Sequence, residues 1–150
     1  MNETFVKLAI KEAKKAYKKG EIPIGAVIVK NNKIISKAHN LVEVKKNAIM
    51  HAEILAITKA TKKLKNWRLN RCEMYVTLQP CSMCVSAIEL SRIDKVYFLT
   101  PKDKEIKINN DKYIHIKNKD EDESLKLIQN FFKKRRWMFH VKHYVKLIKL

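Results

Sequence analysis

Four residues form a set whose types and spacing can do chemistry: His51 and Glu53 in "HAE", and Cys81 and Cys84 in "PCSMC". One imidazole and two thiolates are ligands that zinc prefers, and three protein ligands leave the fourth tetrahedral position to water. An open zinc site lowers the pKa of this water, so that hydroxide is available at neutral pH. Glu53 is predicted to lie beside the water without binding the metal, where its carboxylate can transfer a proton.

Two predicted helices position these residues. The stretch "NAIMHAEILAITKA" (47–60) predicts a mostly apolar helix that has His51 and Glu53 near its start, and "PCSMCVSAIELS" predicts a second helix that has Cys81 in or near its first turn. The predicted strand "EMYVTL" lies between them. Helices that follow neighbouring strands present their N-termini at the same edge of a sheet, so the three ligands are predicted to converge there. The helix N-termini also favour the thiolate forms of Cys81 and Cys84.

Each motif alone is weak evidence for this site. A C-x-x-C also occurs as a redox pair or as half of a structural zinc site, and an isolated H-x-E usually has no function. The ordered set, with Pro80 and a strand between its two parts, favours the open zinc site. Cys72, which opens the same strand, is interpreted as a small structural residue.

The remaining pattern predicts one α/β domain over residues 1–150. Further helices are predicted over 3–19 and from about residue 125, and "HNLVEVKK" is predicted to be a polar loop. The other strands are predicted in "IPIGAVIVK", "IISKA", "KVYFLT" and "KYIHIK". Residues 137–150 form a C-terminal extension whose pattern fits either a helix or a strand.

The composition favours a cytoplasmic protein with an affinity for polyanions. The 33 Lys and Arg residues outnumber the 15 Asp and Glu residues, which gives a formal net charge of +18. Such a surface attracts nucleic acid, although a lysine-rich composition also arises from an AT-rich genome, and both explanations stay open. We expect no signal peptide and no membrane-spanning segment, and three cysteines that include a C-x-x-C fit a reducing compartment.

The chain resembles the cytidine deaminase-like superfamily and is most similar to bacterial tRNA-specific adenosine deaminases. The resemblance covers about residues 5–136 and includes the zinc deaminase signature H-x-E…P-C-x-x-C. It is carried by "EIPIGAVIV", "HN", "HAEILAI", "YVTLQPCSMC", "SRIDKVYF" and "FFKKRR".

The resemblance implies a three-layer α/β/α sandwich around a central five-stranded mixed sheet, with one zinc per subunit. It further implies a homodimer that acts on the anticodon stem-loop of tRNA and hydrolyses adenosine to inosine at the wobble position. By the same resemblance, Asn40 contacts the target nucleoside, Ala52 offers its backbone to the base, and Glu53 is the proton shuttle.

Two departures from the family pattern leave an alternative substrate open. The family usually has Glu at the position of Gln79, and tRNA deaminases typically carry a longer, Gly-containing segment with an Arg-Asp pair after the fourth strand. In this chain the segment that follows Thr100 is short, Lys-rich and without glycine. The alternative is therefore a deaminase of a small nucleobase or nucleoside, such as cytosine or guanine. A catalytically silent RNA-binding protein is disfavoured because Glu53 is present.

Overall fold

The structure, a computed structural model, describes residues 1–102 and 107–148, with side chains described as far as Met138 in the last helix. The middle of the segment after Thr100 and the side chains of most of the predicted extension 137–150 lie outside the described residues. The elements in chain order are α1 (Glu3–Lys18), β1 (Gly25–Lys30), β2 (Lys33–His39), α2 (Val42–Lys45), α3 (Ala52–Leu64), β3 (Cys72–Leu78), α4 (Ser82–Leu90), β4 (Lys95–Thr100), β5 (Tyr113–His115) and α5 (Lys119–Ile148).

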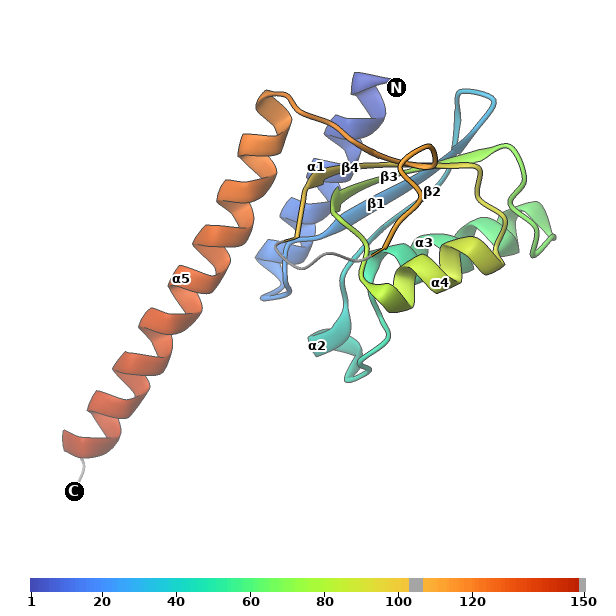
Figure 1. Ribbon diagram of the computed structural model, residues 1–150. Helices are drawn as coiled ribbons and strands as arrows, with labels where there is room; N and C mark the ends of the chain where they lie inside the picture. The colour runs from blue at the N-terminus through green and yellow to red at the C-terminus, as the bar shows by residue number, and fades with distance from the viewer. Residues whose placement is uncertain (103–106, 149–150) are drawn as a thin grey trace.

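A five-stranded mixed sheet organises the molecule, in the order β2-β1-β3-β4-β5. The β1 strand pairs antiparallel with both β2 and β3, whereas β3, β4 and β5 run parallel to one another. Helices α3 and α4 cover one face, α1 covers the other, and α5 begins beside α1 and extends away from the sheet (Figure 1). The predicted three-layer α/β/α sandwich is therefore confirmed.

Both faces of the sheet are buried, and β1 shows why its sequence is apolar throughout. Val27 and Val29 pack on the α1 side, while Ala26 and Ile28 pack on the α3 side. A strand covered on both faces is expected to be a continuous apolar run. At Gly25 the α1 backbone comes so close that an added Cβ would lie 2.0 Å from the carbonyl oxygen of Ala9. This contact sets α1 directly against the start of β1.

The structure differs from the sequence predictions in two local details near the site. The helix predicted over 47–60 begins only at Ala52. The predicted loop "HNLVEVKK" contains the short helix α2, because the carboxylate of Glu21 accepts backbone hydrogen bonds from Glu43 and Val44 in its first turn. The tail whose pattern fitted either a helix or a strand continues α5 as a helix to Ile148.

Within the described residues, no helix is both long enough and apolar enough to cross a bilayer, and α5 in particular carries many charges.

Candidate active site

Two helix starts at one edge of the sheet hold the predicted metal ligands. His51 is the N-cap residue of α3 and Cys81 is the N-cap residue of α4, both with extended backbone and without a side-chain capping bond. Cys84 lies one turn into α4 and is buried. Strand β3 leads into α4 through Gln79 and Pro80, so the sheet fixes where this helix begins. The first N–H groups of a helix have no intrahelical acceptor, so both helices direct free donors towards this edge.

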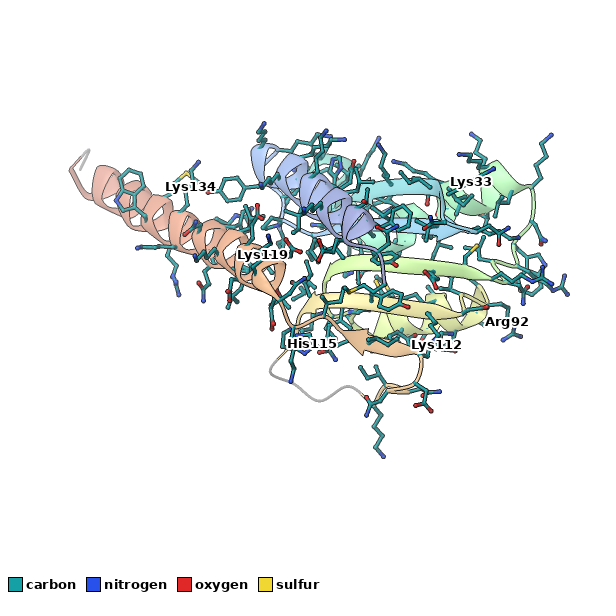
Figure 2. All side chains as sticks on the ribbon, turned by 90° about the horizontal axis from the view of Figure 1, so that it is seen from above. Lys33, Arg92, Lys112, His115, Lys119 and Lys134 are labelled. Atoms are coloured by element: carbon teal, nitrogen blue, oxygen red, sulfur yellow. The ribbon has the colours of Figure 1, made fainter. Side chains whose placement is uncertain are left out.

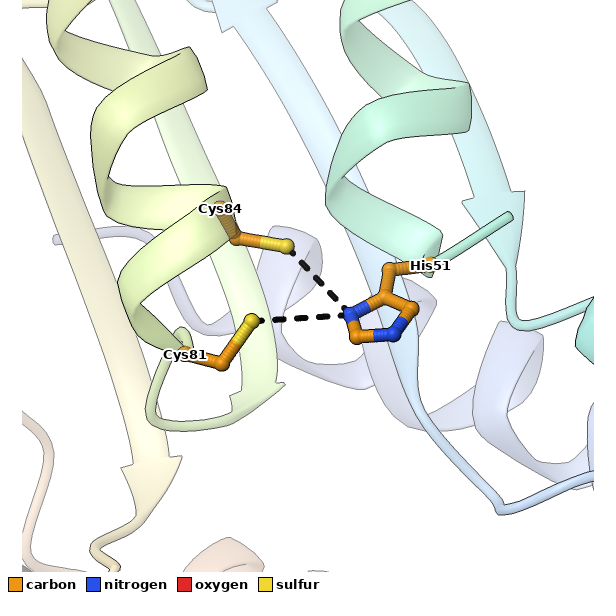
Figure 3. Close-up of side chains that lie close together, drawn as sticks. All are labelled: His51, Cys81 and Cys84. Atoms are coloured by element: carbon orange, nitrogen blue, oxygen red, sulfur yellow. Dashed lines mark hydrogen bonds between the residues drawn. The ribbon is translucent and has the colours of Figure 1, made fainter. Parts of the chain in front are cut away.

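The three candidate donor atoms lie together in the arrangement that zinc requires. The Nδ1 of His51 is 3.6 Å from the Sγ of Cys81 and 3.5 Å from the Sγ of Cys84 (Figure 3). All three donor atoms lie within 4.8 Å of one another. Zinc binds sulfur at about 2.3 Å and imidazole nitrogen at about 2.0 Å, so tetrahedral coordination separates nitrogen from sulfur by about 3.5 Å. The residues present therefore fit a zinc ion.

The thiol of Cys84 and the carboxyl group of Glu53 are both buried and lie close together. Burial raises the pKa of the Cys84 thiol above its usual range, and the neighbouring Glu53 carboxylate raises it further. The expected effect of the helix N-terminus on Cys84 is thus outweighed in the metal-free chain. A bound metal ion reverses this balance, because a coordinating thiol is deprotonated.

Glu53 has an unsatisfied buried oxygen beside the three donors. Its side chain is 3% exposed, and its Oε2 has no hydrogen-bond partner among the described residues. Burial raises the pKa of Glu53 above the ordinary value of a carboxyl group. A buried carboxylate without a partner costs free energy unless a ligand or water supplies one. The free oxygen and the raised pKa are the properties of a group that exchanges a proton with a bound molecule.

Asn40 is held in place by a residue that sequence reasoning missed. The carboxylate of Glu21 is completely buried and accepts a hydrogen bond from the Nδ2 of Asn40, at 3.2 Å. The same carboxylate accepts the N–H groups of Glu43 (3.2 Å) and Val44 (2.7 Å). Because Nδ2 is engaged with Glu21, Asn40 keeps its Oδ1 for a ligand. The available signal was an acidic residue directly before the apolar run "IPIGAVIV".

These groups line one cavity of about 330 Å³, a volume suited to a small ligand or a single nucleobase. Asn40, His51, Glu53 and Cys81 are among its lining residues. Ile128, Phe132 and Arg135 contribute from α5. Ala52 does not line the cavity with its fully buried side chain, but as the first residue of α3 it has a backbone N–H without an intrahelical acceptor.

Gln79 joins the start of α4 to the segment after β4. Its backbone N–H donates to the carbonyl of Thr100 (2.8 Å), and its side-chain Oε1 accepts the backbone N–H of Lys102 (3.0 Å). Both Gln79 and Lys102 line the cavity. The amide oxygen can make this contact as a carboxylate would, so the departure from the usual family residue keeps the acceptor that this contact needs.

A family model supports the zinc assignment independently of the geometry. Residues 1–100 match the zinc-binding region of cytidine and deoxycytidylate deaminases. The expected zinc cofactor is thereby confirmed for this region of the chain.

Individual relatives give a more detailed comparison. A tRNA-specific adenosine deaminase of Bacillus subtilis is 56% identical over 97 residues, which is 65% of this chain and 60% of the relative. The chain thus spans about 60% of the length of that relative.

Two solved structures are similar to a comparable degree. One comes from studies of A-to-I editing by tRNA:A34 deaminases and has a TM-score of 0.65 at 38% identity, covering 67% of this chain and 77% of the other. The second is a guanine deaminase from Bacillus subtilis, with a TM-score of 0.64 at 39% identity, covering 67% of this chain and 66% of the other.

Proposed function

Because the chain belongs to the cytidine and deoxycytidylate deaminase family, we propose that it hydrolyses adenosine to inosine at the wobble position of a tRNA anticodon. The observation that carries the deaminase chemistry is the unsatisfied Oε2 of buried Glu53, next to an imidazole and two sulfurs that can hold zinc. The similarity to tRNA-specific adenosine deaminases supports the choice of adenosine in tRNA as the substrate.

We assign the metal to His51, Cys81 and Cys84, with one zinc per subunit. When bound there, zinc supplies Lewis-acid activation that lowers the pKa of a water molecule to near neutrality. Glu53 is placed to accept a proton from the attacking water and to pass it to the ring nitrogen of the base. A second proton from the water leaves through the same carboxylate to the exocyclic amine, which departs as ammonia while the water oxygen becomes the carbonyl of inosine.

Binding of the base is assigned to Asn40 and to the start of α3. The Oδ1 of Asn40 faces the ligand as an acceptor because Glu21 holds its Nδ2. The backbone N–H of Ala52 supplies a donor at the helix N-terminus. Together these groups orient a planar heterocycle whose amino-bearing carbon lies towards the metal ligands and Glu53.

The test is inosine formation in an unmodified tRNA that carries adenosine at the wobble position. Zinc-loaded protein is expected to produce inosine at that position alone. The Glu53→Ala variant is expected to produce none while it keeps its zinc, because the proton shuttle is removed and the metal ligands are intact. The proposal would be wrong if the zinc-loaded wild-type protein left every wobble adenosine unchanged.

A second candidate function is deamination of a small nucleobase or nucleoside. It is favoured by the similarity to a guanine deaminase and by the short, glycine-free segment after Thr100. Rapid release of ammonia from free guanine or cytosine, with wobble adenosine unchanged in tRNA, would establish this function in place of the first.

We further propose that the protein acts as a homodimer in the cytoplasm. Exposed apolar side chains at Val44, Ile49 and Leu90 support an association between copies. The cytoplasm provides reducing conditions in which Cys81 and Cys84 stay available as thiolates. Light scattering of the zinc-loaded protein at several concentrations tests the dimer, and a monomer at all of them would exclude it.

A further inference from the structure

A second, smaller hollow lies next to the catalytic cavity, between the end of α1 and the middle of α5. It has a volume of about 290 Å³ and is lined by Tyr17, Lys18, Gly20, Phe131, Lys134, Arg135 and Met138. We call it the α1–α5 cradle. Arg135 lines both the cradle and the catalytic cavity, so the two are neighbours at this side chain. Figure 2 shows Lys134 on the part of α5 that lies alongside α1.

The cradle has the chemistry of an anion site. Among the described residues that line it, three are cations and none is a carboxylate. The charges sit above an aromatic base, because the Nζ of Lys134 is 5.9 Å from the ring centre of Tyr17 and the guanidinium of Arg135 is 5.2 Å from that of Phe131. The two rings pack edge to face at 6.3 Å, which fixes α5 against α1. The side-chain stems are thereby held while the charged groups stay exposed.

Arg135 is free to exchange its present partner for a ligand. Its guanidinium is 3.8 Å from the carboxylate of Glu43, and both side chains are about half exposed. An exposed ion pair of this length contributes little free energy. A phosphate, in contrast, matches the guanidinium with two parallel hydrogen bonds.

A stripe of lysines continues from the cradle along the outer face of α1. The exposed residues Lys7, Lys11, Lys14 and Lys18 recur at intervals of three and four, so they lie on one side of the helix, over a length of about 16 Å. Acids of the first turns of α5 lie beside part of this stripe, because Lys7, Lys11 and Lys14 line a hollow together with Asp120 and Glu123. In the first 70 residues Glu12, Glu21 and Glu53 are buried, which leaves Glu3 and Glu43 as the exposed acids of that part of the chain. Among the described residues, Lys14 is the one member of the stripe that forms an ion pair, with Glu123 of α5.

We propose that the α1–α5 cradle binds a backbone phosphate of the RNA strand whose target nucleotide occupies the catalytic cavity, and that the lysine stripe on α1 continues this contact. The proposal rests on the function proposed above and extends it to the path of the substrate. A free mononucleotide does not account for the arrangement, since the cations lead away from the cavity for several turns of α1. A polynucleotide backbone presents phosphates along such a path.

The test is the affinity for a synthetic anticodon stem-loop with adenosine at the wobble position, measured by fluorescence anisotropy in a Glu53→Gln background that prevents turnover. The charge reversal Lys18→Glu/Lys134→Glu is expected to raise Kd roughly tenfold, because two cations that contact the bound phosphate become repulsive. The slope of log Kd against log salt concentration is expected to fall by about 0.7, the value for one phosphate contact to a single strand. Both residues are exposed, so zinc content and thermal midpoint are expected to stay unchanged.

The matched control is Lys33→Glu/Lys62→Glu, which changes the net charge equally on the β1–β2 turn and at the end of α3, away from the cradle. It is expected to change Kd less than twofold, and the variant Lys18→Arg/Lys134→Arg is expected to bind as the unmodified protein does. An equal loss of affinity in the two charge-reversed pairs, or no loss of affinity in the cradle pair, would contradict the proposal that the cradle binds RNA.

The outcome is separable from that of the proposed function. Inosine formation by the protein with Glu53 intact tests the proposed reaction. The affinities of the two charge-reversed pairs test the proposed path of the RNA. In that active background, the cradle pair is expected to raise KM for tRNA and to leave kcat at saturating tRNA within about twofold. A drop in kcat at unchanged KM would contradict a binding role.

Discussion

The catalytic cavity has two sides that are built differently. One side, the ligand side, presents His51, Glu53 and Cys81 to the cavity and includes the buried Cys84. All four residues come from the starts of α3 and α4, which are anchored on the sheet. The other, the α5 side, presents side chains such as Phe132, which is 43% exposed, from a helix that extends away from the sheet. Chemistry is assigned to the fixed, buried side, and contact with a large substrate to the open side.

This difference shows how one reaction can be matched to different substrates. The ligand side depends on two helix starts and tolerates little change, because a metal site needs its donors within a few tenths of an ångström. The α5 side depends on how one helix packs against α1 and can change its side chains without disturbing the donors. Substitutions on the two sides are therefore expected to have effects of different size and kind.

The largest effect is expected on the ligand side from Cys84→Ser. Loss of one thiolate leaves two protein donors, so bound zinc is expected to fall well below one per chain and deamination to become undetectable. The control is Cys72→Ser, which changes another fully buried cysteine that stands outside the donor set. Zinc analysis after dialysis checks both variants, and full zinc retention by Cys84→Ser would show that Cys84 is no ligand.

A smaller effect is expected at Glu21, beneath the ligand side. Glu21→Gln replaces one acceptor oxygen with a donor nitrogen that faces N–H groups, so unfolding is expected to need about 2 kcal/mol less. Because Asn40 loses its anchor, kcat/KM is expected to fall roughly tenfold as well. Urea unfolding and steady-state kinetics measure the two quantities. Glu43→Gln, in an exposed side chain, serves as the control and should change neither by much.

A smaller effect on stability is expected at Gln79, which joins the start of α4 to the segment after β4. Gln79→Leu removes the acceptor for the N–H of Lys102 at a cost of about 1 kcal/mol. The variant Gln79→Glu restores an acceptor and introduces the residue that the family usually has, so it is expected to keep the stability of the original chain. The stabilities are compared by thermal unfolding of the zinc-loaded variants. An equal loss of stability in both variants would show that this hydrogen bond contributes nothing to stability.

The smallest effect on stability is expected on the α5 side. Arg135→Gln breaks the exposed pair with Glu43 and is expected to change the free energy of unfolding by less than about 0.5 kcal/mol. Zinc content is expected to stay at one per chain, since Arg135 comes from α5 and is not one of the donors. A large loss of zinc in this variant would contradict the expectation that the α5 side can change without disturbing the metal donors.

The ligand side could be predicted from the sequence because its information is local. A short motif at each helix start, with a strand between them, was sufficient to bring His51, Cys81 and Cys84 together. The alternation of apolar strands and helices predicted one α/β sandwich, the family resemblance added the five-stranded mixed sheet, and the structure confirms both.

Glu21 and the α5 side could not be predicted because they depend on distant parts of the chain. The partners of Glu21 follow it by about twenty residues, so its position before an apolar run marks Glu21 as unusual without identifying what it contacts. In the pair Phe131–Phe132, periodicity alone does not tell which ring faces the cavity. Packing against Tyr17 of α1 buries Phe131 and leaves Phe132 at the cavity.

The position of α5 last among the elements separates the two sides along the chain. The two helices with the donors precede α5, and the parallel pair β3–β4 that supports them is complete at Thr100. An insertion or a substitution within α5 therefore leaves the order and the spacing of the donors unchanged. The residues that hold the metal and the residues that meet the rest of the substrate can thus vary independently of one another.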